Sequence, residues 1–319
     1  MIPTELKYSV IKNIYEKLSP YVLKTPIIKN PLYLNEFFNT NLYLKLELFQ
    51  NSGCFKVRGA INNILNLSKE QKSAGVTAVS AGNHAIATSY ASNLFLIKNK
   101  IYMYKLANKY RINKVKSLNA NLFLTDPVNA FKNAEEASSE GYFFMHPFDG
   151  KFMIQGNATL GFEITQQIND LDYILVSVGG GGLISGIGSI IRQKFPKCKI
   201  IGIEPLKSNG MTESLKKGFP LKKVKMDSIA DSLSPPLHME YSFNICKNVI
   251  DEIVNVTDQE IVEAMKFAYN HYKFILEPAC AAGLAALSGP LKNNLKNKKT
   301  LLILCGSNID LLTWIKNTS

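Results

Sequence analysis

Short apolar runs alternate with longer stretches of helical periodicity along most of the chain. The runs of strand length lie at 76–79, 100–103, 121–124, 142–145, 173–178, 199–203, 252–256 and 300–304. Helix-like stretches such as 129–140 separate them, and Thr257 with Glu260 forms a capping-box sequence that predicts a helix running to about Tyr269. Strands that alternate with helices are typical of an α/β fold, and we expect two parallel sheets.

The composition is that of a globular protein without a membrane segment. Of 319 residues, 46% are hydrophobic and 19% are charged, which is ordinary for a soluble domain. No apolar run is long enough to cross a bilayer. The N-terminus lacks the basic stretch and apolar block of a secretory signal. We therefore expect a cytoplasmic protein.

The formal net charge of +12 raises the question of nucleic-acid binding. The lysines are scattered, as at 216–217, 222–223 and 298–299, whereas proteins that bind nucleic acids concentrate charge on one element. We interpret the excess as a lysine-rich solvated surface with no nucleic-acid partner, whose field favours anionic ligands. The five cysteines, at 54, 198, 246, 280 and 305, include no CxxC pair, which fits a reducing compartment.

The first of four candidate ligand loops is 50–60, in which Lys56 lies between Phe55 and Val57. Ligands of parallel sheets bind at the carboxyl ends of strands, where loops meet helix N-termini. A lysine in this small, apolar setting is a candidate desolvated amine, and desolvation lowers the pKa of a lysine and makes it a Schiff-base former. The alternative is a surface lysine whose stem packs while its ammonium group stays in water.

The second loop is Ser80–His84, between an apolar strand and a helix-like stretch over 85–92. Backbone N–H groups at a helix N-terminus bind carboxylates or phosphates without a charged side chain. Ser80 or Asn83 could instead be an ordinary helix cap, and a lone histidine such as His84 is more often structural.

The third loop is a run of four glycines, Gly179–Gly182, before a helix that begins near Ile184. Consecutive N–H groups can converge there on a dianion, and the helix N-terminus adds a favourable field. Because a turn needs only one or two glycines, four favour a phosphate site. A dinucleotide site is the alternative, since Gly180-x-Gly182-x-x-Ser185 approaches the dinucleotide fingerprint and Glu204 ends the next strand.

The fourth loop, 304–308, follows the last apolar run and carries Cys305. A thiol in this place is either buried packing or a weak hydrogen-bonding partner for a ligand.

Taken together, the loops resemble those of the serine/threonine dehydratase and serine racemase family of pyridoxal-phosphate (PLP) enzymes. Further segments of the family occur in the same order: Thr25-Pro26, Lys45-Leu46-Glu47, Phe55–Ala60, His146-Pro147-Phe148-Asp149, Gly202–Pro205, Ala230-Asp231 and Glu277-Pro278. The resemblance implies the two-domain, open twisted parallel-sheet fold of PLP fold type II, like that of tryptophan synthase β. It implies a large PLP-binding domain over 1–67 and 147–319, a small domain over 68–146 that closes over the substrate, and a homodimer.

The resemblance also implies roles for the loop residues. Lys56 would carry the cofactor and take the α-proton of the substrate. The other cofactor contacts would be Phe55, Asn83 at the phenolic oxygen, Gly179, Gly180, Gly181, Gly182 and Leu183 at the phosphate, Glu277, and Cys305 beside the pyridine nitrogen. The substrate carboxylate would be surrounded by Ser80, Ala81, Gly82, Asn83 and His84.

Cys305 stands where the family usually has a serine, and this position bears on the chemistry. A carboxylate there would keep the pyridine nitrogen protonated, which suits transamination. A neutral thiol favours α-deprotonation with loss of the β-hydroxyl group. The implied activity is a PLP-dependent ammonia-lyase of the L-threonine and L-serine dehydratase type, which forms the 2-oxo acid and ammonia.

Racemisation is the nearest alternative, because it uses the same cofactor and the same base. It needs a second acid/base on the opposite face, and Ala81 stands where the racemases have a serine that resembles this group. A β-replacement enzyme and a non-catalytic PLP- or amino-acid-binding protein stay open, the latter because Cys54, Asn157 and Ser232 depart from the family pattern. A dinucleotide enzyme would leave the Lys56 and Cys305 loops unexplained.

A divalent-cation site of the family is incomplete in this sequence. In relatives the cation is held by the Glu of the Glu-Pro motif, a carbonyl four residues on, and an acidic residue two further. The matching residues are Glu204, Ser208 and Gly210, so one oxygen ligand is missing. We assign no metal site, and Glu204 and Ser208 remain the residues that would form one.

Overall fold

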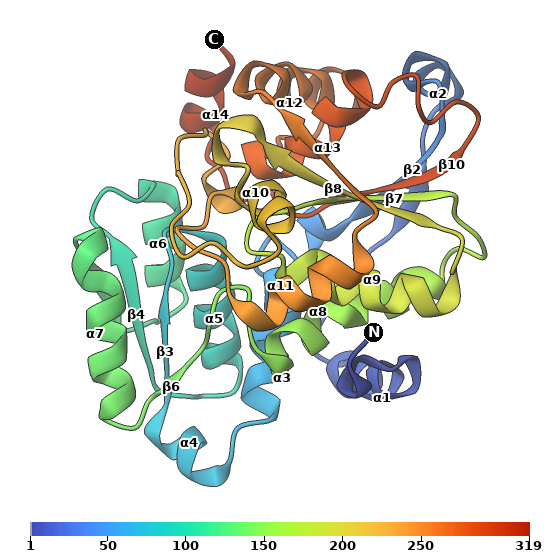
Figure 1. The fold of residues 1–319 in the computed structure, drawn as a ribbon. Helices are drawn as coiled ribbons and strands as arrows, with labels where there is room; N and C mark the ends of the chain where they lie inside the picture. The colour runs from blue at the N-terminus through green and yellow to red at the C-terminus, as the bar shows by residue number, and fades with distance from the viewer. Residues whose placement is uncertain (1) are drawn as a thin grey trace.

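The structure is a computed structural model that describes residues 2–319. Its strands are β1 Ile27–Lys29, β2 Asn41–Leu46, β3 Val76–Val79, β4 Asn99–Tyr104, β5 Leu122–Thr125, β6 Phe143–Phe144, β7 Tyr173–Ser177, β8 Lys199–Pro205, β9 Glu252–Val256 and β10 Lys299–Leu304. They form a six-stranded sheet in the order β1-β2-β10-β7-β8-β9 and a four-stranded sheet in the order β5-β4-β3-β6 (Figure 1). Every strand pair is parallel except β1 with β2.

Helices connect the strands. The α-helices are α1 Tyr8–Leu18, α2 Leu32–Phe38, α3 Lys56–Leu65, α4 Lys69–Ala74, α5 Asn83–Leu94, α6 Lys109–Ser117, α7 Pro127–Ser139, α8 Lys151–Thr165, α9 Gly182–Lys194, α10 Gly210–Lys217, α11 Glu240–Val249, α12 Asp258–Tyr272, α13 Pro278–Ser288 and α14 Leu311–Thr318. Among residues 2–319, no helix combines the length and the apolar character that a bilayer crossing needs.

Both sheets are covered by helices on both faces, as parallel sheets require. In the six-stranded sheet, α12 and α13 form one layer and α8 and α9 the other (Figure 1). In the four-stranded sheet, Ala78 of β3 packs with Ile86 of α5 and Val115 of α6, while its neighbour Val79 packs with Ala134 of α7. Successive residues of one strand therefore serve opposite helix layers.

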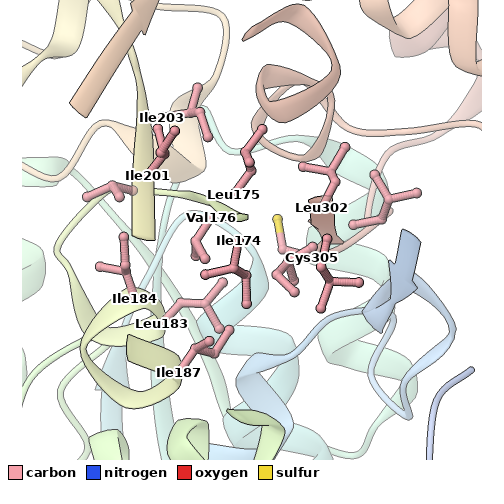
Figure 2. Close-up of a cluster of buried hydrophobic side chains, with 14 of the residues drawn as sticks. Ile174, Leu175, Val176, Leu183, Ile184, Ile187, Ile201, Ile203, Leu302 and Cys305 are labelled. Atoms are coloured by element: carbon pink, nitrogen blue, oxygen red, sulfur yellow. The ribbon is translucent and has the colours of Figure 1, made fainter. Parts of the chain in front are cut away.

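β7 shows why the central strands read as continuous apolar runs. Ile174, Leu175 and Val176 are all fully buried. Figure 2 shows Ile174 directed toward Leu183 and Ile187 of α9, and Leu175 directed to the other side of the strand. A strand with helices on both faces has no polar side to display.

A buried ion network anchors α3, the helix that begins at Lys56. The Nζ atom of Lys45 donates to Glu163 at 2.5 Å, and the guanidinium of Arg58 donates to both oxygens of Glu47 at 2.8 Å and to Glu163 at 3.1 Å. All four side chains are fully buried. Two positive and two negative charges neutralise one another, so the loss of any one partner would leave a buried charge unpaired, which typically costs about 3–5 kcal/mol.

The predicted α/β architecture with two sheets is confirmed. The predicted limits of β3 and β9 match the observed ones, and those of the other predicted strands differ by one or two residues at an end. The capping box of α12 is also present, with Thr257 and Glu260 bonded reciprocally. β1 and β2 were not predicted. β1 has only three residues, too few to show a pattern. β2 contains the charged residue Lys45, so its sequence does not look like a buried strand, although Lys45 is fully buried in the ion network.

Candidate active site

A cavity of about 510 Å³ lies between the two sheets, at the carboxyl ends of β3, β7 and β10. All residues predicted to contact cofactor or substrate line it: Phe55, Lys56, Ser80, Ala81, Gly82, Asn83, His84, Gly179, Gly180, Gly181, Gly182, Leu183, Glu277 and Cys305. Four loops that are far apart in the sequence thus meet at one place.

Lys56 is the first residue of α3 and extends into the cavity. Its Nζ atom donates a hydrogen bond to the carbonyl of Pro147 at 2.8 Å and lies 5.2 Å from the centre of the Phe55 ring. Burial lowers the pKa of this amine, and the nearby Cys54, Cys305 and Glu277 oppose the shift. A lowered pKa enlarges the neutral fraction, which is the form that acts as a nucleophile or base.

The second loop leads from β3 into the N-terminus of α5. The hydroxyl of Ser80 accepts from the N–H of Gly82 at 3.1 Å, and no side chain caps the first turn of α5. The first N–H groups of a helix have no partner within the helix, so this end can receive an anion. Ala81 presents only a methyl group to the cavity.

His84 is buried beside this loop and is held in one orientation. Its Nε2 atom lies 2.8 Å from the carbonyl oxygen of Met145, so Nε2 carries the proton, because only an N–H can bond a carbonyl. Burial lowers the pKa of His84 to about 3, with a further contribution from Lys56. The ring is therefore neutral near pH 7, and its Nδ1 atom has no partner in the protein.

The four glycines are required by packing as well as by any ligand. A side chain at Gly180 would fall inside the ring of Phe148. Gly181 has a φ of +87°, and a Cβ there would lie 2.6 Å from the Sγ atom of Cys246. The glycine run by itself is therefore a weaker sign of a phosphate site than the sequence indicates. The feature best suited to an anion is the N-terminus of α9, which opens into the cavity and is capped by no side chain.

Cys305 follows β10 and joins the fourth loop to the first. Its carbonyl accepts from the N–H of Phe55 at 3.1 Å, and Gly306 forms a bridge with Cys54. A hydrogen bond with Cys280 raises the pKa of Cys305 well above its usual value, and burial adds to the shift. The group at this position is a neutral thiol.

A polar network that the sequence did not reveal links the two sheets across the cavity. Arg111 of α6 donates to Asp231 and, at 3.1 Å, to Glu277, while Asn83 of α5 donates to the other oxygen of Glu277 at 2.7 Å. Asn308 donates to the side-chain oxygen of Asn83 at 2.7 Å. No motif marks Arg111, because its partners are 120 and 166 residues away.

Aromatic side chains form the cavity wall beyond the Ser80 loop, and the sequence did not identify them either. Tyr104, Phe131 and Phe144 come from the four-stranded sheet and α7. Leu237 and Met239 come from the segment that crosses from the other side. This part of the cavity is mostly apolar, with Glu135 of α7 as a charged residue in its lining.

Glu204 and Ser208 do not line the cavity. Both carboxylate oxygens of Glu204 accept hydrogen bonds at 2.7 Å, from the backbone of Met211 and from the backbone and hydroxyl of Thr212. Glu204 thus closes the N-terminus of α10, and Ser208 Oγ accepts from the N–H of Asp227 at 3.0 Å. Among the described residues, no cluster of three or more His, Cys, Asp or Glu side chains is arranged to hold a metal ion.

Comparisons with known proteins agree with this geometry. The profile of the pyridoxal-phosphate dependent enzyme family matches residues 18–306. The chain is 39% identical to a phenylserine dehydratase of Ralstonia pickettii, over 97% of this chain and 95% of the relative. It is 35% identical to an L-threonine ammonia-lyase of Thermotoga maritima, over 94% of this chain and 75% of the relative. Among solved structures, maize serine racemase superposes with a TM-score of 0.90 at 29% identity, covering 97% of this chain and 96% of the racemase.

Proposed function

The chain belongs to the pyridoxal-phosphate dependent enzyme family, and on this premise we propose that it is an ammonia-lyase that converts L-threonine, L-serine or both into the 2-oxo acid and ammonia. Dehydratases and an ammonia-lyase are among its relatives over nearly the whole chain. The single observation that carries the proposal is the position of Lys56. Its partly buried amine, with a lowered pKa, faces the same cavity as the open N-terminus of α5.

The residues present fit the cofactor. An amine for covalent attachment, Lys56, stands at one side of the cavity, and the uncapped N-terminus of α9 stands at another. Among the described residues, three of the cavity-lining ones carry a buried polar atom without a protein partner: His84, Asn157 and Ser177. Buried polar atoms normally have partners, so such a group is an indication that a ligand completes the site.

Bound PLP would supply an electron sink at the α-carbon of the substrate. The chain's own residues would position the substrate and move the proton. The N–H groups at Ser80–His84 would hold the substrate carboxylate at the start of α5, where the helix field favours an anion. The neutral amine of Lys56 would take the α-proton, and the carbonyl of Pro147 would receive an N–H of the amine and orient its lone pair.

The test is product formation by the purified protein. L-serine and L-threonine should each be assayed for the 2-oxo acid and for ammonia in equal amounts, beside a Lys56→Ala variant. Ammonia without the 2-oxo acid, or no product with a full complement of cofactor, would contradict the proposal.

A β-hydroxy amino acid with a larger substituent is a second candidate substrate. The aromatic wall of Tyr104, Phe131 and Phe144 favours an apolar group there, and one relative is named a phenylserine dehydratase. The ratio of kcat/KM for threo-phenylserine to that for L-threonine should exceed one. Phe131→Ala should lower this ratio, whereas Phe123→Ala, on the outer strand β5, should leave it unchanged.

We also propose a cytoplasmic homodimer. All five cysteines are free and buried, which suits a reducing compartment. Leu32 and Tyr33 of α2 are 73% and 57% exposed, and Phe49 after β2 is 50% exposed, so the part of the chain that forms the six-stranded sheet leaves large apolar side chains uncovered. Light scattering should give the mass of a dimer, and Leu32→Glu should lower it. The control Leu106→Glu, at a leucine that follows β4 and is 96% exposed, should leave the mass unchanged.

A further inference from the structure

Ser177, the last residue of β7, presents a hydroxyl group that no protein atom uses. The residue is 4% exposed and lines the cavity, and its Oγ atom has no hydrogen-bond partner. A hydroxyl can donate one hydrogen bond and accept two. Leaving such a group unpaired in the interior is unfavourable, so a bound ligand is the natural partner.

The strand pairing places Ser177 beside the Cys305 loop. β7 and β10 are parallel neighbours with Leu175 opposite Leu302. Two residues further on, the same register brings Ser177 opposite Leu304, the residue before Cys305. Figure 2 shows Cys305 at this end of β10, near Leu302.

The direction of the Ser177 side chain separates it from the phosphate end of the site. Side chains alternate along a strand, so Ser177 shares the side of Leu175 and not that of Ile174. Ile174 points toward α9, whose N-terminus follows the four glycines (Figure 2). Ser177 therefore faces the opposite layer, where α13 contacts β7 and where Glu277 and Ala279 at the start of α13 line the cavity.

The chemistry of this corner calls for a better donor than a thiol. Cys305 is a weak hydrogen-bonding group, and its thiol is already engaged with Cys280. The carboxylate of Glu277 at this corner is already bonded to Asn83 and Arg111. The N-terminus of α13 carries partial positive charge, which disfavours a protonated ring nitrogen and favours a neutral nitrogen that accepts a hydrogen bond. A serine hydroxyl is the stronger donor for such an acceptor.

We propose that the Oγ–H group of Ser177 donates a hydrogen bond to the pyridine nitrogen of the bound cofactor, beside Cys305. The assignment adds a cofactor contact from β7 to those of the four loops. It concerns the chain's hold on the cofactor and is independent of which amino acid is the substrate.

The first test compares Ser177→Ala with Ser189→Ala. Ser189 is fully buried in α9, and its hydroxyl donates to the carbonyl of Ser185, so it is a matched serine with a satisfied hydroxyl. Ser177→Ala should leave the melting temperature of the apoprotein unchanged or raise it by about 2 °C, yet weaken cofactor binding about 3- to 10-fold. Ser189→Ala should lower the melting temperature and leave cofactor binding unchanged. A Ser177→Ala apoprotein that melts lower, or that binds cofactor as tightly as the unchanged chain, would overturn the proposal.

The second test identifies the cofactor atom. With ring ¹⁵N-labelled PLP, the nitrogen resonance of the holoenzyme should move in Ser177→Ala and stay nearly unchanged in Cys305→Ala, while the ³¹P resonance stays unchanged in both. A nitrogen resonance that moves only in Cys305→Ala would assign the contact to the thiol. A ³¹P resonance that moves in Ser177→Ala would assign the hydroxyl to the phosphate. Either result would refute the assignment, and the Cys305→Ala spectrum decides even where Ser177→Ala does not fold.

Discussion

The Nδ2 atom of Asn83 donates to Oε1 of Glu277 over 2.7 Å, which ties the start of α5 to the start of α13 across the cavity. The other oxygen of Glu277 accepts from Arg111. Burial raises the pKa of Glu277 and Arg111 opposes the shift. The charge of Glu277 therefore depends on its partner from the other sheet.

Arg111→Met should destabilise the apoprotein strongly, because it leaves the charge of Glu277 unpaired in the interior. Arg111 and Glu277 are 6% and 1% exposed, and breaking a buried pair costs about 3–5 kcal/mol in the free energy of unfolding. The control is Lys105→Met, which breaks the exposed pair with Asp126 and should cost no more than about 1 kcal/mol. Urea unfolding measures the loss of unfolding free energy in both variants. Equal losses would contradict the prediction that the buried pair contributes more to stability than the exposed one.

Lys56→Ala should abolish covalent attachment of the cofactor. The purified protein should absorb in the near-visible region, and borohydride should fix the label on the peptide that contains Lys56. Loss of the base should lower kcat by at least about 10²-fold. The control is Lys72→Ala, an exposed lysine of α4. A label on any other lysine would exclude Lys56 from this role.

Gly181 is best tested with a pair of substitutions. Gly181→Ala and Gly181→Asp both place a Cβ against Cys246 at a φ of +87°, so both should lower the stability of the protein. Only Gly181→Asp adds a negative charge near the N-terminus of α9. Cofactor affinity measured by equilibrium dialysis should therefore fall further in Gly181→Asp than in Gly181→Ala. Equal affinities would argue against an anion site at this loop.

Acid should destabilise the apoprotein through three histidines, of which His84 and His238 are buried and His146 is partly buried. Burial lowers the pKa of His84 to about 3, and that of His146 and His238 to about 4. The unfolded chain binds these protons near pH 6.5 and the folded chain does not. The stability that the neutral histidines contribute is therefore fully present above pH 6.5 and is lost as the pH drops toward 4. Each histidine adds up to about 1.4 kcal/mol per pH unit.

Urea unfolding between pH 7.5 and 5 checks this linkage. The slope of the unfolding free energy against pH gives the number of protons that the chain takes up on unfolding. His84→Gln should lower this number by about one near pH 5, whereas His271→Gln, at an exposed residue of α12, should not change it. A slope that is the same in His84→Gln as in the unchanged chain would mean that His84 takes up a proton while folded.

The parts of this structure that were predictable are those that depend on local pattern. β9 matches the run 252–256 at both ends, and Thr257, which caps α12, follows it directly. The four candidate ligand loops could be recognised because each has small or polar residues close to an apolar run. They are the loops of Lys56, Ser80, the four glycines and Cys305. Once the parallel sheets were expected, a common site at the carboxyl ends followed.

The rest depends on tertiary packing, which a single sequence does not display. Ser177 lies inside an apolar run, and only the strand register shows that its hydroxyl faces the cavity without a partner. Lys45 in β2 looks exposed until Glu163, 118 residues away, neutralises it. Phe131 belongs to the polar-looking helix α7 and faces the site only because that helix packs on β3 and β4. The domain boundaries at 67/68 and 146/147 stay predictions.

Ala81 should make elimination dominate racemisation. With L-serine as substrate, Lys56 can move a proton on one face of the α-carbon, and inversion needs a second group that returns a proton to the other face. Ala81 lines the cavity with a methyl group, which has no proton to give. The oxygen of Ser80 accepts from the N–H of Gly82, which holds it against the backbone of its own loop, and the hydroxyl of Ser232 donates its proton to Asp231 at 3.3 Å.

Elimination needs no such group, and a missing general acid typically slows a step about 10²- to 10⁴-fold. Pyruvate should therefore form at least about 10² times faster than D-serine when both are measured in one incubation. Ala81→Ser should raise the D-serine rate, because it puts a hydroxyl on the empty face, while Ser232→Ala should leave the product ratio unchanged. If D-serine forms as fast as pyruvate in the unchanged chain and Ser232→Ala removes it, Ser232 reaches the second face after all, and Ala81 does not determine the outcome.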